Sequence, residues 1–122
     1  MPASGEQQRG GSLHAAISDM VVRVTAEYTG RGPTRARTII NGDWVLVALT
    51  DTLTKGERTL ARNGRGQFVR DARRAFQDAM REAFVTEIES LTGRRVIAFL
   101  SDNHIDPDVA IECFQLAADV DA

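Results

Sequence analysis

The chain has 122 residues, of which 43% are hydrophobic and 26% are charged, as is ordinary for one globular domain. Its formal net charge of −2 argues against bulk electrostatic attraction to nucleic acid or to an anionic membrane. Cys113 is its one cysteine, which rules out an intrachain disulfide and suits a reducing compartment. The sequence contains neither the apolar core of a signal peptide nor a membrane-spanning run of roughly 20 apolar residues. We therefore expect a cytoplasmic protein without direct membrane insertion.

The first predicted helix follows a polar, glycine-rich stretch. Residues 1–11 are predicted to be a disordered tail, and Ser12 is a suitable N-cap. Apolar residues then recur at helical spacing as far as Tyr28. From this start we expect a single domain over residues 12–117, with a frayed acidic tail at 118–122.

A joint from Tyr28 to Pro33 ends this helix. Gly30, Gly32 and Pro33 stop the helix and turn the chain, because glycine reaches positive φ and proline lacks an N–H. Arg31 lies between the two glycines. The joint is therefore either an anion-binding nest of backbone N–H groups beside a guanidinium, or a stiff corner.

Two β-rich runs, residues 34–40 and 43–50, follow the joint. Asn41-Gly42 connects them, and this pair is the strongest short signal for a hairpin because a type I′ turn needs positive φ at both positions. In the second run Trp44, Leu46 and Ala48 alternate with three further apolar residues. Both faces of this strand are apolar, which favours a central strand.

In the second half of the chain, two helical patterns precede a second hairpin pattern. Thr54 and Glu57 form a capping-box pattern for a short helix over residues 55–62. Residues 67–91 are the longest helical pattern, with a broad apolar stripe that includes Phe68 and Phe76. Runs 94–100 and 109–116 are predicted strands, joined by a polar loop over residues 101–108.

The predicted order is α-β-β-α-α-β-β, an α+β fold. Two hairpins most simply form one four-stranded antiparallel sheet with the helices packed on one face. The other face would then expose one of the two apolar sets of the second strand. Because such a face is usually covered, we expect a homodimer or another protein partner.

Charge is distributed unevenly along the chain. Residues 55–74 hold seven bases against two acids, whereas residues 101–122 hold six acids and no base. Phe68 and Phe76 fall on the apolar stripe, so no exposed aromatic side chain is expected among the arginines, which disfavours nucleic acid as a partner. A solvated face or a protein contact is the preferred interpretation of the basic run.

Several segments together resemble the MpsC-like family of small bacterial proteins, first described as a domain of unknown function. The matching segments are Tyr28–Pro33, the hairpin with Trp44, Leu53–Arg58, Glu87–Gly93 running into Val96, and the region of Ser101-Asp102 and Asp106–Asp108. The resemblance covers about residues 12–117. It implies association with a sodium-translocating system that generates membrane potential and whose other components are membrane proteins. It implies no enzymatic activity, no cofactor and no catalytic residues.

Three candidate sites follow from the residues. Arg31, Arg35 and Arg37 would hold a phosphate or carboxylate above the glycine amides, or would form a tight turn with a solvated strand edge.

The acidic loop is the second candidate. Asp102, Asp106 and Asp108 resemble part of a calcium loop, but the pattern lacks the glycine and glutamate of such loops, so a solvated turn is preferred. The third candidate, a nucleophilic site at Cys113, has no neighbouring base in the sequence, and no catalytic fingerprint is present.

The sequence therefore favours a non-enzymatic accessory or regulatory module without a cofactor, docking on a membrane transport complex. Tyr28, the Gly30–Pro33 corner, Lys55 and Arg58 are its expected contact residues, with Arg35 and Arg37 beside them. The alternative function is a small-anion or ligand sensor that uses the corner and its nearby arginines.

Overall fold

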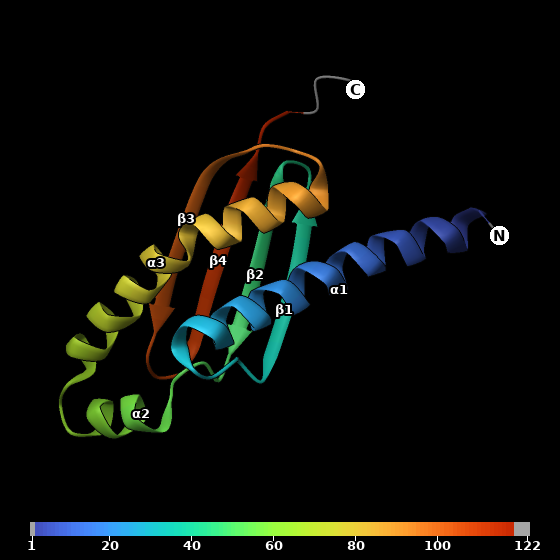
Figure 1. Cartoon of the computed structure of the whole chain (residues 1–122). Coiled ribbons are helices and arrows are strands. Elements are labelled where there is room, and N and C mark those ends of the chain that lie inside the picture. The colour runs from blue at the N-terminus through green and yellow to red at the C-terminus, as the bar shows by residue number, and fades with distance from the viewer. Residues whose placement is uncertain (1, 119–122) are drawn as a thin grey trace.

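A computed structural model describes the backbone of residues 2–118 and the side chains of residues 11–118. The elements in chain order are α1 (Pro2–Thr29), β1 (Arg35–Asn41), β2 (Trp44–Thr50), α2 (Lys55–Arg62), α3 (Gly66–Thr92), β3 (Val96–His104) and β4 (Val109–Leu116). Figure 1 shows α1 and α3 together on one face of the sheet and α2 at one end of it. The predicted α+β fold and its element order are confirmed.

The four strands form one antiparallel sheet in the order β1-β2-β4-β3. Each hairpin pairs its own two strands, and β2 joins β4 in the middle, as expected for a strand that is apolar on both faces. The first hairpin is confirmed, but Asn41 pairs with Trp44 as the last residue of β1, and the chain turns through Gly42 (φ +59°) and Asp43. The expected type I′ turn at Asn41-Gly42, with positive φ at both positions, is therefore wrong by one residue, and of these residues Gly42 alone has positive φ.

The core lies between the two long helices and the sheet. Ile17, Val21 and Val24 of α1 and Met80, Phe84 and Ile88 of α3 are buried against Val45, Val47 and Leu49 of β2. Phe84 meets the ring of Phe114 edge to face at 6.4 Å. Such aromatic pairs add to the stabilisation that comes from burial alone.

Two element boundaries differ substantially from those expected, the start of α1 and the end of β3. Helix α1 begins at Pro2 instead of after Ser12, so the cap signal at Ser12 did not mark its start. The side chains of residues 1–10 and all of 119–122 lie outside the described residues, and the predicted tails at 1–11 and 118–122 and the domain limits stay predictions. Strand β3 continues to His104, so the loop is only 105–108, because residues 101–104 pair with β4 despite their polarity.

The inward face of α3 also differs from the expected stripe in its first half. Phe68 is 64% exposed, whereas Val69, Arg73 and Gln77 are buried. Repeats at every fourth residue drift by about 40° per step around a helix with 3.6 residues per turn. The stripe that is correct at Met80 is therefore out of phase near the helix start. The expectation that Phe68 belongs to the core is wrong, and so is the expectation that no aromatic side chain is exposed among the arginines of this segment.

The side of the sheet turned away from α1 and α3 is called the open face here. Alternation along β2 places Val45, Val47 and Leu49 in the core and leaves Trp44 and Leu46 on the open face. Trp44 is 43% exposed. Among the described residues, no helix combines the length and the apolar character that crossing a bilayer demands.

Candidate functional site

The polar groups of the molecule gather at one end of the sheet, called the polar end. It consists of residues 30–35, 51–62, 65–77 and 101–109, and in Figure 1 it is the end at which α2 lies. The first hairpin brings its open strand ends here and the second hairpin brings its closed turn, residues 105–108, while the closed turn of the first hairpin lies at the opposite end.

The Gly30–Pro33 corner packs tightly on α1. Gly30 has φ +85°, and its N–H donates to Ala26 O at 2.9 Å, which closes the helix. A Cβ on Gly32 would come within 3.1 Å of Val22 Cγ1, so the close approach of the chain to α1 favours glycine there. Pro33 is buried. The corner is thus a stiff structural joint.

Arg31 is held by the segment that follows β2. Its Nη2 donates to Asp51 Oδ2 at 2.7 Å, and its Nε donates to Leu53 O at 3.3 Å. Arg58 of α2 reaches the same two groups, with Nη2 donating to Asp51 Oδ1 at 2.8 Å and to Leu53 O at 3.1 Å. We call Arg31, Asp51 and Arg58 the Asp51 cluster.

Asp51 has φ 60°, a left-handed conformation that Asp tolerates better than most residues. The hydrogen bond from Arg31, followed by the charges of Arg31 and Arg58, holds the pKa of the Asp51 carboxyl below its usual range. The carboxylate therefore occupies the position that an anionic ligand of Arg31 would take. This arrangement favours the structural interpretation of Arg31.

Asp108 fixes the same segment from the other side. Its Oδ1 accepts hydrogen bonds from Thr52 N at 3.0 Å and Thr52 Oγ1 at 2.9 Å, and its Oδ2 accepts from Leu53 N at 2.9 Å. Asp102 lies instead beside Arg74, and Asp106 is exposed. Within the described part of the chain no three His, Cys, Asp or Glu side chains converge as metal ligands would.

An ion pair that is largely shielded from solvent joins α2 to α3. Arg73 is 4% exposed, and its Nη1 is 3.3 Å from Glu57 Oε1. Glu57 also completes the capping box of α2, because its carboxylate accepts from Thr54 N while Thr54 Oγ1 accepts from Glu57 N. The short helix is thereby attached to α3, although no residue of α2 is itself buried.

Further inside, Glu112 of β4 lies on the core face of the sheet and is 2% exposed. It accepts hydrogen bonds from Ser101 Oγ and, at 3.3 Å, from Gln77 Nε2. Burial raises the pKa of the Glu112 carboxyl to about 7, although both hydrogen bonds and the Arg73 charge oppose this rise. Glu112 therefore changes protonation near neutral pH.

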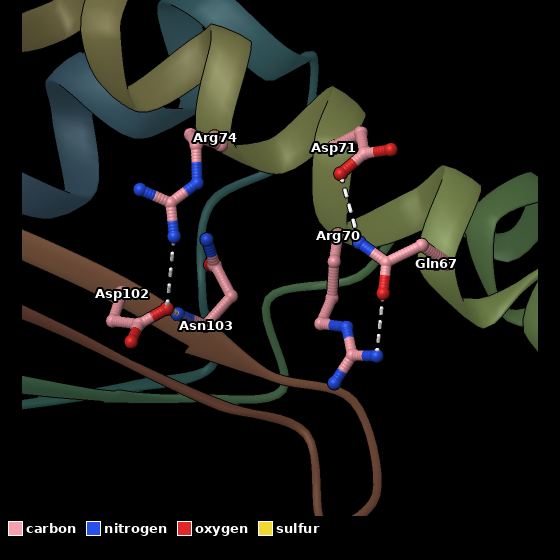
Figure 2. A pocket seen from close by; sticks show the side chains of 6 residues that line it. All are labelled: Gln67, Arg70, Asp71, Arg74, Asp102 and Asn103. Carbon is pink, nitrogen blue, oxygen red and sulfur yellow. Dashed lines mark hydrogen bonds and ion pairs between the residues drawn. The ribbon is translucent and has the colours of Figure 1, made fainter.

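A pocket of about 290 Å³ opens beside this buried group. Figure 2 shows it between the start of α3 and the end of β3, and its lining is Gln67, Arg70, Asp71, Arg74, Asp102 and Asn103. Asn103 Nδ2 donates to Gln77 Oε1 at 2.7 Å, and Gln77 bonds Glu112, so two hydrogen bonds link the pocket to the buried carboxyl.

The outer surface of α2 and the start of α3 is basic and partly apolar. We call it the basic surface, and its exposed members are Lys55, Leu60, Arg62, Arg65, Phe68 and Arg70. Interfaces between proteins are enriched in Arg and aromatic residues of this kind. Lys55 lies in it as expected, but Arg58 is drawn into the Asp51 cluster.

The remaining expected contact residues are spread over other surfaces. Tyr28 is 43% exposed on α1. Arg35 and Arg37 are exposed and project from the same face of β1, and the ion pairs among the described residues include neither of them. Arg31 and Arg58 are thus the expected contact residues that the structure brings together.

Cys113 lies on the open face, and burial raises the pKa of its thiol, which keeps it protonated at neutral pH. A protonated thiol is a poor nucleophile.

The family described as "Na+-translocating membrane potential-generating system (MpsC)" matches residues 9–118 of this chain. An uncharacterized protein of Bacillus subtilis (strain 168), YrhF, is 24% identical over 107 residues, which cover 86% of this chain and 88% of that protein. No solved structure matches. Because the family match spans nearly the whole domain, the chain belongs to the MpsC family.

Proposed function

We propose that the protein is a non-enzymatic accessory module of a sodium-translocating, membrane-potential-generating system, and that it acts through protein contacts. Family membership supports the association with such a system. The absence of a membrane-spanning helix among the described residues fits a role in which other subunits cross the bilayer. In this proposal the module is cytoplasmic and reaches the inner face of the membrane through its partner.

The observation that carries the proposal is the basic surface. Arg62, Arg65 and Arg70 are exposed on the same two segments as Leu60 and Phe68, which are 39% and 64% exposed. This mixture fits an acidic, amphipathic segment of a membrane subunit, because opposite charge steers the encounter and the apolar side chains supply buried area. The Asp51 cluster and the Glu57–Arg73 pair hold α2 in place behind this surface.

Oligomeric state is the second part of the proposal. The open face carries Trp44, Ile39, Leu100 and Ile111 at exposed fractions between 39% and 56%. Monomers rarely leave such a continuous apolar face in water. We take the functional unit to be a homodimer that covers this face.

A second candidate function is a small-anion or ligand sensor. Arg31 is paired with Asp51, so the corner itself offers no free guanidinium. The pocket lined by Arg70 and Arg74 also contains Asp71 and Asp102, so an anion there would displace Asp102 from its weak, exposed pair with Arg74. The hydrogen-bonded link from this pocket to Glu112 would let such an occupant change the protonation of that carboxyl. A thermal-shift screen of inorganic and organic anions tests this candidate, since a ligand that binds only the folded state raises the midpoint.

Affinity capture from native membranes tests the main proposal. The wild-type protein should retain membrane subunits of the transport system, and an Arg62→Glu/Arg65→Glu double variant should lose them. Arg95→Glu is the control, because Arg95 is exposed on the α3–β3 connection at the other end of the sheet. Retention of no membrane protein by the wild type would refute the proposal.

A further inference from the structure

The open face carries one row of apolar side chains across all four strands. The register aligns Ile39 of β1 with Leu46 of β2, Cys113 of β4 and Leu100 of β3. Ile39 and Leu100, at the two edges, are 47% and 56% exposed. The row therefore extends over the full width of the sheet and is unprotected at both ends.

The neighbouring row is charged at its edges with opposite sign. Arg37 of β1 aligns with Ala48 of β2, Ile111 of β4 and Asp102 of β3. Arg37 is exposed. Asp102 lies 3.8 Å from Arg74 Nη2, in a pair whose side chains are 67% and 73% exposed, and such exposed pairs contribute little. Arg37 is thus available to a partner, and Asp102 becomes available by leaving this weak pair with Arg74.

This pattern is complementary to itself under one symmetry operation. Let a two-fold axis run parallel to the strands, between the open faces of two copies. Each row of one copy then lies over the same row of the other copy, and β1 of one copy lies over β3 of the other. Arg37 of each copy then lies above Asp102 of the other, and Ile39 lies above Leu100. A two-fold axis perpendicular to the strands would instead place β1 above β1, so that the two edges that carry Arg35 and Arg37 would face each other, which like charges oppose.

The geometry of sheet packing is compatible with this arrangement. Packed sheets lie about 10 Å apart and cross at about 30°, which displaces facing edge strands by a few ångströms, within reach of an arginine side chain. Four strands at about 4.8 Å spacing and about 24 Å length offer a projected area on the order of 450 Å² per copy. The relief of side chains raises the accessible area above this value, toward the roughly 800 Å² per partner of stable interfaces.

We infer that the open face is the homodimer interface, with two sheets packed face to face about a two-fold axis parallel to the strands and with Arg37 of each copy paired to Asp102 of the other. A second copy is favoured over an anionic membrane surface, because Asp102 at one edge would repel such a surface. This inference specifies the interface of the homodimer in the proposed function and does not depend on the membrane partner.

A charge exchange tests the pairing. Arg37→Asp and Asp102→Arg should each weaken dimerisation at least about tenfold, measured by sedimentation velocity over a concentration series. The Arg37→Asp/Asp102→Arg double variant restores opposite charges and should recover most of the lost affinity. Singles without effect, or a double variant as weak as the singles, would overturn the pairing.

An apolar pair of variants tests the face independently of charge. Leu100→Asp should dissociate the dimer, whereas Phe68→Asp, which changes an even more exposed side chain on α3, should not. Trp44 is the only tryptophan and lies on the open face, so its emission should shift to shorter wavelength as the wild-type protein associates. A monomer at every concentration overturns the homodimer itself, and a dimer indifferent to Leu100→Asp overturns only this interface.

Discussion

Replacing Glu112 by Gln removes the one strongly perturbed carboxyl of the core. Glu112 accepts hydrogen bonds from Ser101 Oγ and Gln77 Nε2. The neutral acid and the amide each offer one donor and one acceptor, so either group is satisfied when the Ser101 hydroxyl turns to accept. The ionised form must instead remain charged while 2% exposed. Glu112→Gln should therefore fold like the wild type at low pH and be the more stable protein at high pH.

The magnitude follows from the pKa. Burial raises the pKa of Glu112 from 4.5 to about 7. Between these two values the folded state binds more protons than the unfolded state, so the free energy of unfolding falls as pH rises through this window. At about 1.4 kcal/mol for each pH unit, the wild type should lose about 3 kcal/mol by about pH 8. Glu112→Gln should not show this loss.

Urea denaturation at several pH values between about 4.5 and about 8 measures this difference, with Trp44 fluorescence and circular dichroism as probes. The difference between variant and wild type isolates Glu112, because every other titrating group is common to both proteins. Equal pH slopes for the two proteins would refute the assignment of a neutral, buried Glu112. A variant that is less stable at every pH would show that Glu112 is needed as a charge.

Three further changes test the packing and the segment connections. Asp108→Ala removes the acceptor of three hydrogen bonds and should cost about 2–4 kcal/mol in urea denaturation, whereas Asp78→Ala, on the exposed side of α3, should leave stability nearly unchanged. Phe84→Ala should cost about 3–5 kcal/mol by the same assay, because Phe84 is 0% exposed in the core, while Phe68→Ala should change stability by less than about 0.5 kcal/mol. Thr54→Ala should lower the free energy of unfolding by about 1 kcal/mol, because it removes the cap of α2. Thr54→Ser keeps a capping hydroxyl and should retain most of the wild-type stability. Equal stability of the two variants would contradict the capping box.

Local signals predicted the elements that depend on neighbouring residues. Asn41-Gly42 marks the first hairpin, and Thr54 with Glu57 marks the start of α2, whose bounds Lys55–Arg62 are those expected. Both signals act within four residues, where the chain's own stereochemistry decides the outcome. The antiparallel sheet then followed from the two hairpins.

The phase of α3 could not be predicted by counting apolar residues. Val69, Arg73 and Gln77 face the core in its first half, and two of the three are polar. Arg73 is buried because it pairs with Glu57. Gln77 is buried because Glu112 and the backbone at the end of β3 accept its hydrogen bonds. No local pattern announces such partners, since they come from other elements.

Glu112 does have a local signal in the sequence. It lies between Ala110 and Phe114 in a strand whose alternate residues are buried, so period two placed a carboxyl on the core face. The links from Arg31 to Asp51 and from Asp108 to Thr52 have no such signal. They join residues 20 and 56 positions apart, which only the assembled sheet brings together.

The central claim, that the module serves a sodium-driven membrane potential through its basic surface, is tested most directly by the membrane potential of cells. Cells that lack the protein should lose part of their sodium-dependent potential, measured with a potential-sensitive dye. The wild-type protein and Arg95→Glu should restore it, and Arg62→Glu/Arg65→Glu should not. An unchanged sodium-dependent potential in cells without the protein would contradict the account.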